Sequence, residues 1–213
     1  MGTQTALIFG AMPCRSWGHL DALRAERPLV ICADGGVHCA AAAGFAPDCY
    51  VGDGDSGGTA VAGAENVLLR PEKDESDLQA AYTMARAHGC TRLYLTACTG
   101  GRLDHLLGNL QILAFISEKA PGTAAEILGS HERVWLLDGG SRSIQGKPES
   151  TFSVLCHSDR AEGVTIRGAR FGLENAVMTN RFPLGISNRI GEERIATISV
   201  EKGILFVIYP KEV

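Results

Sequence analysis

Short apolar segments alternate with helix-like segments through the first part of the chain, and this alternation restricts the fold more than any other feature. The apolar segments occupy residues 6–10, 29–34, 49–53, 66–69 and 92–97. The clearest helical spacing lies at 74–88 and 103–119. Because right-handed crossovers join strands that alternate with helices, the pattern predicts a mainly parallel sheet covered on both faces. Ligands of such sheets gather at the carboxyl ends of the strands.

The pattern changes after Pro121 and Gly122, where short strand-like segments follow one another without helices. These segments are SIQG, TFSVLCH, GVTIRGA, NAVMT, RIATISV and GILFVIY, and clusters of Gly, Pro, Asn and Ser separate them. We therefore predict two domains. Residues 1–130 should form an α/β domain, a three-layer, Rossmann-like structure around a mainly parallel sheet, and residues 131–213 an all-β sandwich or barrel.

Composition narrows the classes of function. The 213 residues carry 20 basic and 24 acidic side chains, and the net charge of −4 without a basic run argues against nucleic-acid binding. No stretch reaches the ~18 apolar residues of a membrane span, and the N-terminus lacks the basic region of a secretory signal. The seven cysteines contain no CxxC pair and indicate reduced thiols. We expect a cytoplasmic protein that binds small molecules.

Aspartates concentrate in the first half: eight of the ten lie within residues 1–104. The first motif is ADGG at 33–36, where an apolar strand leads into Asp34 and two glycines. Gly35 and Gly36 would let the backbone approach a ligand, and the following helix would offer free N–H groups to a phosphate. The alternative is a tight turn in which Asp34 caps that helix.

The second motif, GDGDS at 52–56, follows the next strand. In an extended loop, Asp53 and Asp55 project to the same side, an arrangement that suits a hard cation with oxygen ligands. A solvated, turn-forming Asp pair is the alternative. Paired carboxylates at a buried strand end are costly without a cation, and this cost keeps the two interpretations nearly even.

The third motif, KDESD at 73–77, opens a predicted helix. Asp74 is a plausible N-cap, with Asp77 three residues further on. Lys73 adds a cation for phosphate beside two acids that can bind Mg²⁺, all at one helix N-terminus. Simple capping remains an equal alternative.

The fourth motif, TGGRLDHLLGN at 99–109, follows the strand at 92–97. Arg102 could bind phosphate oxygens in a forked geometry, and Asp104 and His105 begin the next helix. His105 shares a helix face with Asn109. A capping or core role is commoner for a histidine, but the acidic and basic neighbours of His105 favour a site.

All four motifs lie where a predicted strand gives way to a loop or helix, and in a parallel sheet these points share one edge. Six carboxylates together with Lys73 and Arg102 would form a site for divalent ions and a polyphosphate. A nucleoside triphosphate with Mg²⁺ is the simplest ligand of this kind. The sequence contains neither a Walker A loop nor a protein-kinase signature.

In this order and at these intervals, the motifs ADGG, GDGDS, KDESD and GGRLDH resemble those of the thiamine pyrophosphokinase family. The likeness continues in GVTIRGARFGLENAV, PLGISNRIG and ATISVEKGILFVI, which are similar to its β-rich thiamine-binding domain. The resemblance implies Mg²⁺-dependent transfer of the terminal diphosphate of ATP to the hydroxyl of thiamine, giving thiamine diphosphate and AMP. It also implies a homodimer in which thiamine lies where the β domain of one subunit meets the catalytic edge of the other.

The resemblance also implies roles for individual residues. The metal ligands would be Asp53, Asp55 and Asp77. The nucleotide and its phosphates would contact Asp34, Gly35, Gly36, Lys73, Arg102, His105 and Asn109. Asp104 is the candidate for orienting or deprotonating the acceptor hydroxyl, with Asp74 and Arg102 as further catalytic candidates. Ser187 and Asn188, in GISN, match the substrate motif, although residues 185–188 would also make a good turn.

Three other functions remain open from the sequence. The first is a related diphosphokinase that acts on a hydroxymethylpterin or similar alcohol. The second is a Mg²⁺-dependent nucleotide phosphohydrolase, which would need no acceptor. The third is a nucleotide sensor without catalysis, which should tolerate the loss of Asp53 and Asp55 better than an enzyme would.

Overall fold

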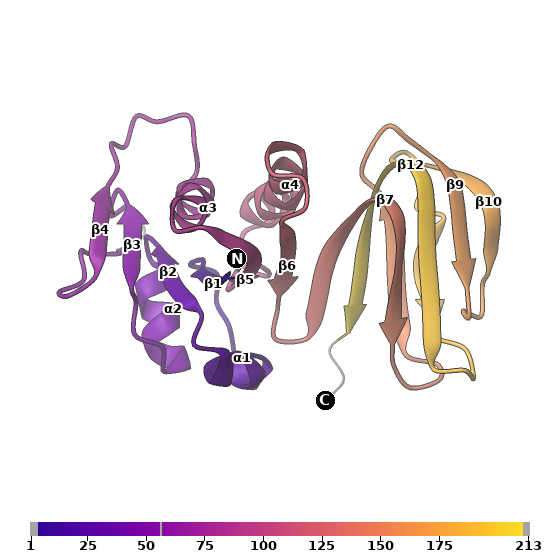
Figure 1. Cartoon of the computed structure of the whole chain (residues 1–213), viewed down its shortest axis with the longest axis horizontal. Coiled ribbons are helices and arrows are strands. Elements are labelled where there is room, and N and C mark those ends of the chain that lie inside the picture. The colour runs from indigo at the N-terminus through magenta and orange to yellow at the C-terminus, as the bar shows by residue number, and fades with distance from the viewer. Residues whose placement is uncertain (1–3, 56, 211–213) are drawn as a thin grey trace. The chain divides into compact units, whose positions relative to one another are not determined.

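The computed structural model describes residues 4–55 and 57–210, and the chain divides between Ser130 and His131 into two compact units. The first unit contains every α-helix of the described chain, and the second is built from strands (Figure 1). Parallel and antiparallel pairings both occur, and strands outnumber helices. None of the helices in the described part of the chain has the length and apolar character that a membrane crossing requires.

The sheet of the first unit is parallel. Its strands are β1 (Gln4–Phe9), β2 (Leu29–Ala33), β3 (Cys49–Gly52), β4 (Glu65–Leu68), β5 (Cys90–Thr96) and β6 (Ala124–Leu128), in the order β6-β5-β1-β2-β3-β4. Every neighbouring pair in this series runs parallel, as the alternation in the sequence predicts. β1 and β3 are almost wholly buried, because parallel strands carry helices on their faces.

Helices pack on both sides of this sheet (Figure 1). They are η1 (Gly18–Leu20), α1 (Asp21–Glu26), α2 (Gly36–Ala43), α3 (Asp77–Ala87) and α4 (Leu103–Lys119). α2 packs on β1 and β2, whereas α3 packs on β1, β2, β3 and β5 and also contacts α4. The narrower, Rossmann-like description of this unit stays a prediction.

α3 begins three residues later than the predicted helix at 74–88. Its N-cap is Ser76, whose backbone is extended and whose hydroxyl oxygen accepts a 3.2 Å hydrogen bond from Gln79 N. The prediction that Asp74 caps the helix is therefore wrong. Ser76 satisfies one of the free N–H groups of the first turn, and this frees Asp77 to point its carboxylate elsewhere.

The second unit contains β7 (Glu132–Gln145), β8 (Thr151–Cys156), β9 (Arg160–Arg167), β10 (Leu173–Thr179), β11 (Gly185–Arg189) and β12 (Ile195–Pro210). All of their pairings are antiparallel. The sequence pattern predicts separate strands for RVWLLDG (133–139) and SIQG, and likewise for RIATISV and GILFVIY. The structure joins the first two segments into β7 and the last two into β12. β12 pairs with β7 along one edge, and on its other edge with β9 and then β8.

A bend explains why these segments do not separate into shorter strands. The register of β12 against β7 shifts between Val200 and Ile204, and Gly203 lies within the shift at φ +93°. A Cβ on Gly203 would lie 2.6 Å from Arg160 O, so only glycine fits there. Gly139 and Gly140 adopt positive φ on the facing strand. The two strands bend together at this bulge, where β12 changes its partner from β9 to β8.

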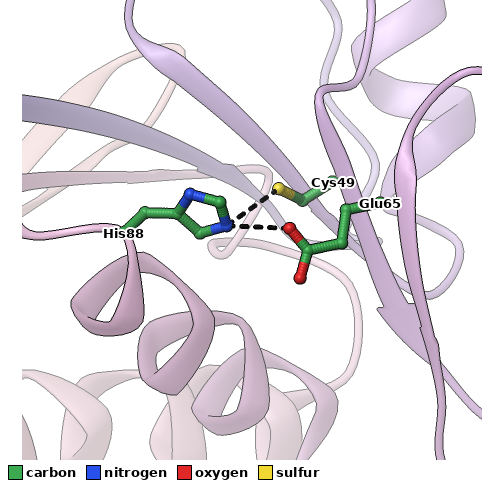
Figure 2. A group of neighbouring side chains, drawn as sticks. All are labelled: Cys49, Glu65 and His88. Carbon is green, nitrogen blue, oxygen red and sulfur yellow. Dashed lines mark hydrogen bonds and ion pairs between the residues drawn. The ribbon is translucent and has the colours of Figure 1, made fainter.

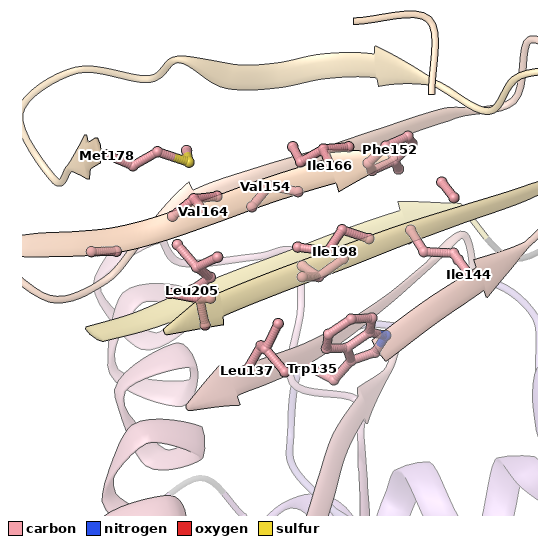
Figure 3. Packing of buried hydrophobic residues seen from close by; sticks show 14 of the residues in the cluster. Trp135, Leu137, Ile144, Phe152, Val154, Val164, Ile166, Met178, Ile198 and Leu205 are labelled. Atoms are coloured by element: carbon pink, nitrogen blue, oxygen red, sulfur yellow. The ribbon is translucent and has the colours of Figure 1, made fainter. Parts of the chain in front are cut away.

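One apolar cluster fills the interior of the second unit (Figure 3). Trp135 is 1% exposed, and Phe152, Val154 and Leu205 are equally inaccessible. Alternate residues of strands that bend around a common centre point inward, and this period of two produces the cluster. Trp135 therefore belongs to the core.

Candidate functional site

Four carboxylates converge at the carboxyl ends of β2 and β3. Asp34 follows β2, Asp53 and Asp55 follow β3, and Asp77 begins α3. Each of the four offers an oxygen, and these oxygens all lie within 4.8 Å of one another. The two strands end side by side in the parallel sheet, so the loops that follow them bring together residues about 20 positions apart.

Asp34 is the most constrained member of this acidic cluster. It is 2% exposed, its φ is +42°, and its Oδ1 accepts hydrogen bonds of 3.0 Å from both Tyr50 OH and Gly54 N. The N-cap of α2 is Gly35, so the carboxylate of Asp34 is directed to Tyr50 and Gly54. A Cβ on Gly58 would lie 2.4 Å from Asp34 O, so the loop after β3 can approach Asp34 this closely only because residue 58 is a glycine.

Lys73 lies among the carboxylates and neutralises part of their charge. Its Nζ lies 2.5 Å from Asp53 Oδ2 and 3.1 Å from Asp77 Oδ1. The hydrogen bond from Lys73, followed by one from Asp55 N, lowers the pKa of Asp53. Burial raises the pKa of Asp77 although Lys73 opposes the rise. One lysine therefore compensates these acids incompletely, and a further cation would be favourable there.

Tyr50 is a site residue that the sequence analysis missed. Its hydroxyl donates to Asp34, and burial, together with that hydrogen bond, raises the pKa of Tyr50 to about 12. The hydroxyl therefore stays a donor at neutral pH. A tyrosine inside an apolar strand is usually a core residue, and the only sequence signal was its place just before GDGDS.

A cavity of about 450 Å³ opens over the acidic cluster. The wall includes all four aspartates and Lys73, and the predicted residues Arg102, His105 and Asn109 also line it. It includes Gly10 and Met12 as well, from the loop after β1, which the sequence analysis did not single out. The amide of Asn109 donates a 2.9 Å hydrogen bond to Cys98 O and so fixes α4 to the end of β5.

The two glycines of ADGG lie at the start of α2 and outside the residues that line this cavity. A Cβ on Gly36 would lie 2.1 Å from Phe9 O. Gly36 therefore allows α2 to pack closely on the end of β1. The predicted contact of Gly35 and Gly36 with a nucleotide stays a proposal.

Arg102 and Asp104 form a bidentate ion pair at the start of α4. Arg102 Nε lies 3.2 Å from Asp104 Oδ1, and Nη2 lies 2.6 Å from Oδ2. This pairing lowers the pKa of Asp104 to about 2. Asp104 and Asp74 line a neighbouring cavity of about 470 Å³, which shares Ser76, His105 and Asn109 with the first.

In the second unit, Ser187 and Asn188 lie on β11, so the alternative interpretation of residues 185–188 as a turn is wrong. Ser187 has φ +57° at an irregularity of the pairing with β8, and it is exposed. Asn188 is 3% exposed: its Oδ1 accepts from Phe171 N, and its Nδ2 donates to Phe171 O at 2.7 Å. Asn188 thus holds the backbone of Phe171, whereas Ser187 is accessible to a ligand.

The acidic cluster lies with a lysine and an arginine at the carboxyl ends of a parallel sheet, and a β unit follows. This arrangement is typical of the class of enzymes that act on phosphorylated small molecules. Comparisons with known proteins give the family within this class.

The family described as "Thiamin pyrophosphokinase, catalytic domain" matches residues 20–122, and "Thiamin pyrophosphokinase, vitamin B1 binding domain" matches residues 142–205. Together these matches cover well over half of the chain. The chain belongs to the thiamine pyrophosphokinase family. The matches do not favour the alternative functions.

Relatives agree with this assignment. Thiamine pyrophosphokinase of Bacillus subtilis is 28% identical over 142 residues, which span 66% of this chain and 65%, just under two thirds, of the relative. Its crystal structure superposes with a TM-score of 0.85 at 26% identity and covers 99% of this chain and 100% of that one. The enzyme from Candida albicans, 16% identical, shares the fold with a TM-score of 0.77 over 97% and 90% of the two chains.

Proposed function

We propose that this chain transfers the terminal diphosphate of ATP to the hydroxyl of thiamine, giving thiamine diphosphate and AMP. One observation carries the proposal: four carboxylates, Lys73 and Arg102 surround one cavity inside the segment that matches the family's catalytic domain. The thiamine hydroxyl oxygen attacks the β-phosphorus, the bond from that phosphorus to the α–β bridging oxygen breaks, and the hydroxyl proton passes to solvent. We place the reaction in the cytoplasm, because the seven cysteines are free thiols.

We propose Mg²⁺ as the cation, with Asp53, Asp55 and Asp77 as its ligands. The residues fit such an ion, because carboxylate oxygens are the ligands it prefers and several converge within 4.8 Å. The raised pKa of Asp77 marks a partly buried carboxylate whose charge Lys73 alone does not compensate. When bound, the ion would neutralise phosphate oxygens that carry the charge of the transition state.

The protein groups around the cavity would act by position and charge. Lys73 and Arg102 are the cations available to phosphate oxygens, and His105 and Asn109 lie on the same wall. Tyr50 and Gly54 hold Asp34 in place. Asp104, with a pKa of about 2, is too weak a base to remove a proton from an alcohol, so its role would be to orient the acceptor. Positioning of this kind is how phosphoryl transfer is usually catalysed.

The second unit would supply the thiamine contacts. It matches the vitamin B1 binding domain over residues 142–205, and Ser187 is exposed on β11. Phe171 is 59% exposed, and Asn188 fixes its backbone. An exposed aromatic ring suits a flat, partly apolar ring such as that of thiamine. We also propose the homodimer that the family resemblance implies, which light scattering on the purified chain would test.

Product analysis tests the proposed reaction. Purified chain is incubated with ATP and Mg²⁺, with and without thiamine, and nucleotides and thiamine species are separated by chromatography. The proposal expects AMP and thiamine diphosphate in equal amounts, only when thiamine is present. AMP or ADP formed without an acceptor would indicate a phosphohydrolase instead. Asp21→Asn, a change at an exposed residue paired with Arg24, serves as the control that should keep full activity.

A further inference from the structure

A second cluster of side chains of the kinds that ligate metals lies in the first unit (Figure 2). It lies at the ends of β3 and α3 that are opposite to the acidic cluster. Cys49 begins β3, Glu65 begins β4, and His88 is the C-cap of α3. One donor atom from each lies within 4.8 Å of the others. The function proposed above uses none of these residues.

The donor atoms of this Cys-Glu-His cluster face a common point. His88 Nε2 lies 2.9 Å from Glu65 Oε2 and 3.9 Å from Cys49 Sγ. Cys49 is 1% exposed, whereas the side chains of His88 and Glu65 are 35% and 55% exposed. The thiol therefore forms the floor of the cluster, and the other two side chains cover it toward solvent.

This geometry does not suit a catalytic relay. In a nucleophile–histidine–acid triad, the nucleophile and the acid contact different ring nitrogens, so that a proton can pass through the ring. Here Nε2 alone faces both Cys49 and Glu65 (Figure 2). Donors that share one ring nitrogen converge on a point instead, as the ligands of a metal ion do.

We propose that Cys49, Glu65 and His88 bind a thiophilic divalent transition-metal ion, with Zn²⁺ as the representative ion and solvent in the remaining position. Bonds of about 2.3 Å to sulfur and about 2.0–2.2 Å to nitrogen and oxygen in a tetrahedron separate ligand atoms by roughly 3.3–3.7 Å. The observed separations of 2.9 and 3.9 Å bracket that range, so small side-chain rotations admit the ion. A thiolate and an imidazole favour Zn²⁺ over Mg²⁺, whereas the acidic cluster offers only oxygen.

Charge and protons balance at this site. Burial, together with the charges of Glu65 and Asp48, raises the pKa of Cys49 to about 11, so the metal-free thiol is protonated. Binding forms a metal–sulfur bond, breaks the S–H bond and releases one proton to solvent. The thiolate and the Glu65 carboxylate then neutralise the two positive charges of the ion, and His88 binds as a neutral ring.

The site has a structural consequence for the first unit. Residues 53–64 connect β3 to β4 and carry Asp53 and Asp55, and α3 carries Asp77 at its other end. An ion bound by Cys49, Glu65 and His88 would tie together the start of β3, the start of β4 and the end of α3. It would therefore brace the elements that present the acidic cluster.

Cobalt substitution tests the proposal on the full, freshly reduced chain. Co²⁺ bound to a thiolate gives a sulfur-to-metal charge-transfer band in the near ultraviolet, which oxygen ligands alone do not give. We expect this band to saturate at one Co²⁺ per chain and to be lost in Cys49→Ala. Two control variants should keep this band. Asp53→Asn alters only the acidic cluster, and Cys14→Ser removes another thiol, one that is partly exposed.

Affinity for Zn²⁺ provides a second measurement, by competition with a chromophoric chelator. We expect Glu65→Gln to weaken binding about tenfold and His88→Ala about a hundredfold. His88 lies at a partly exposed helix end, so His88→Ala tests the site even if Cys49→Ala folds poorly. A wild-type chain without the thiolate band would overturn the proposal. A band or affinity unchanged in His88→Ala would overturn it equally.

Discussion

The two units place their polar side chains in different ways. In the first unit, parallel strands end at one edge, and the loops that follow them bring Asp34, Asp53, Asp55 and Asp77 within 4.8 Å of one another. In the second unit, antiparallel strands bend around an apolar core, and the side-chain amide of Asn188 forms hydrogen bonds with the backbone of Phe171. The edge of the parallel sheet brings together charged carboxylates that folding alone does not require. In the β unit, by contrast, the buried Asn188 holds the backbone at Phe171.

The largest effect should follow from Asp53→Asn. The substitution removes a charged oxygen from the cluster, and we expect kcat/KM for diphosphate transfer to fall about 10³-fold. It also weakens the 2.5 Å contact with Lys73, for a loss of about 2 kcal/mol in the free energy of unfolding. Kinetics and urea unfolding measure the two effects, with Asp21→Asn as the control. An Asp53→Asn chain with most of its activity would remove Asp53 from the site.

The second effect concerns the bend of the β unit. Gly203→Ala places a Cβ 2.6 Å from Arg160 O at a positive φ, and we expect the free energy of unfolding to fall by about 2–4 kcal/mol. Gly139→Ala is the matched control. Gly139 also has positive φ, but no atom lies within 4 Å of its Cβ position, so only backbone strain of about 1 kcal/mol applies. Equal losses in the two variants would show that the close approach to Arg160 is unimportant.

Much of this architecture follows from sequence pattern. Alternation of strands and helices predicts the parallel sheet, and the position of each acidic motif after a strand predicts that the motifs meet at one edge. The exact end of a helix cannot be predicted from the same pattern. Ser76 and Asp74 are both good N-caps three or fewer residues from Asp77, and only the backbone conformation selects Ser76.

The other differences have similar causes. The glycines at 139, 140 and 203 lie inside β7 and β12, but the sequence pattern indicates strand ends there. Sequence alone cannot distinguish a bulge inside a strand from a turn. The sequence pattern does not predict the ion pair between Arg102 and Asp104, although the two residues are only two positions apart, because the motif does not show which anion Arg102 contacts. Tyr50 escapes notice because its partner, Asp34, is 16 residues away and meets it only through the pairing of β2 with β3.

The third effect separates Asn188 from Ser187. Asn188→Ala removes a buried amide and both of its hydrogen bonds to the backbone of Phe171, and we expect a loss of about 2 kcal/mol in the free energy of unfolding. Ser187→Ala should change stability by less than about 0.5 kcal/mol. If Ser187 contacts thiamine, its loss should raise KM for thiamine more than KM for ATP. Equal changes in both KM values would make the Ser187 effect structural.

The fourth effect contrasts two acids of one cluster. The pKa of Asp53 is lowered by Lys73, so its ionisation stabilises the fold above its unfolded pKa, and that stability is lost as pH falls through the folded pKa. The pKa of Asp77 is raised by burial, so its ionisation costs stability as pH rises from the unfolded toward the folded value. Without divalent ions at pH 7, Asp77→Asn should therefore have a Tm equal to or above wild type, unlike Asp53→Asn. A lower Tm in Asp77→Asn would show that its contact with Lys73 outweighs burial.

The smallest effect concerns Asp104. Because Arg102 lowers the pKa of Asp104 to about 2, this carboxylate is fully ionised from pH 5 to pH 9 and cannot produce an acidic limb in the rate profile. We expect Asp104→Asn to lower kcat while leaving the shape of the pH dependence of kcat, which reports the enzyme–substrate complex, unchanged across that range. The same profile recorded for wild type and Asp104→Asn decides the matter. An acidic limb present in wild type and lost in Asp104→Asn would make Asp104 a general base, and would mean that ATP and thiamine separate it from Arg102.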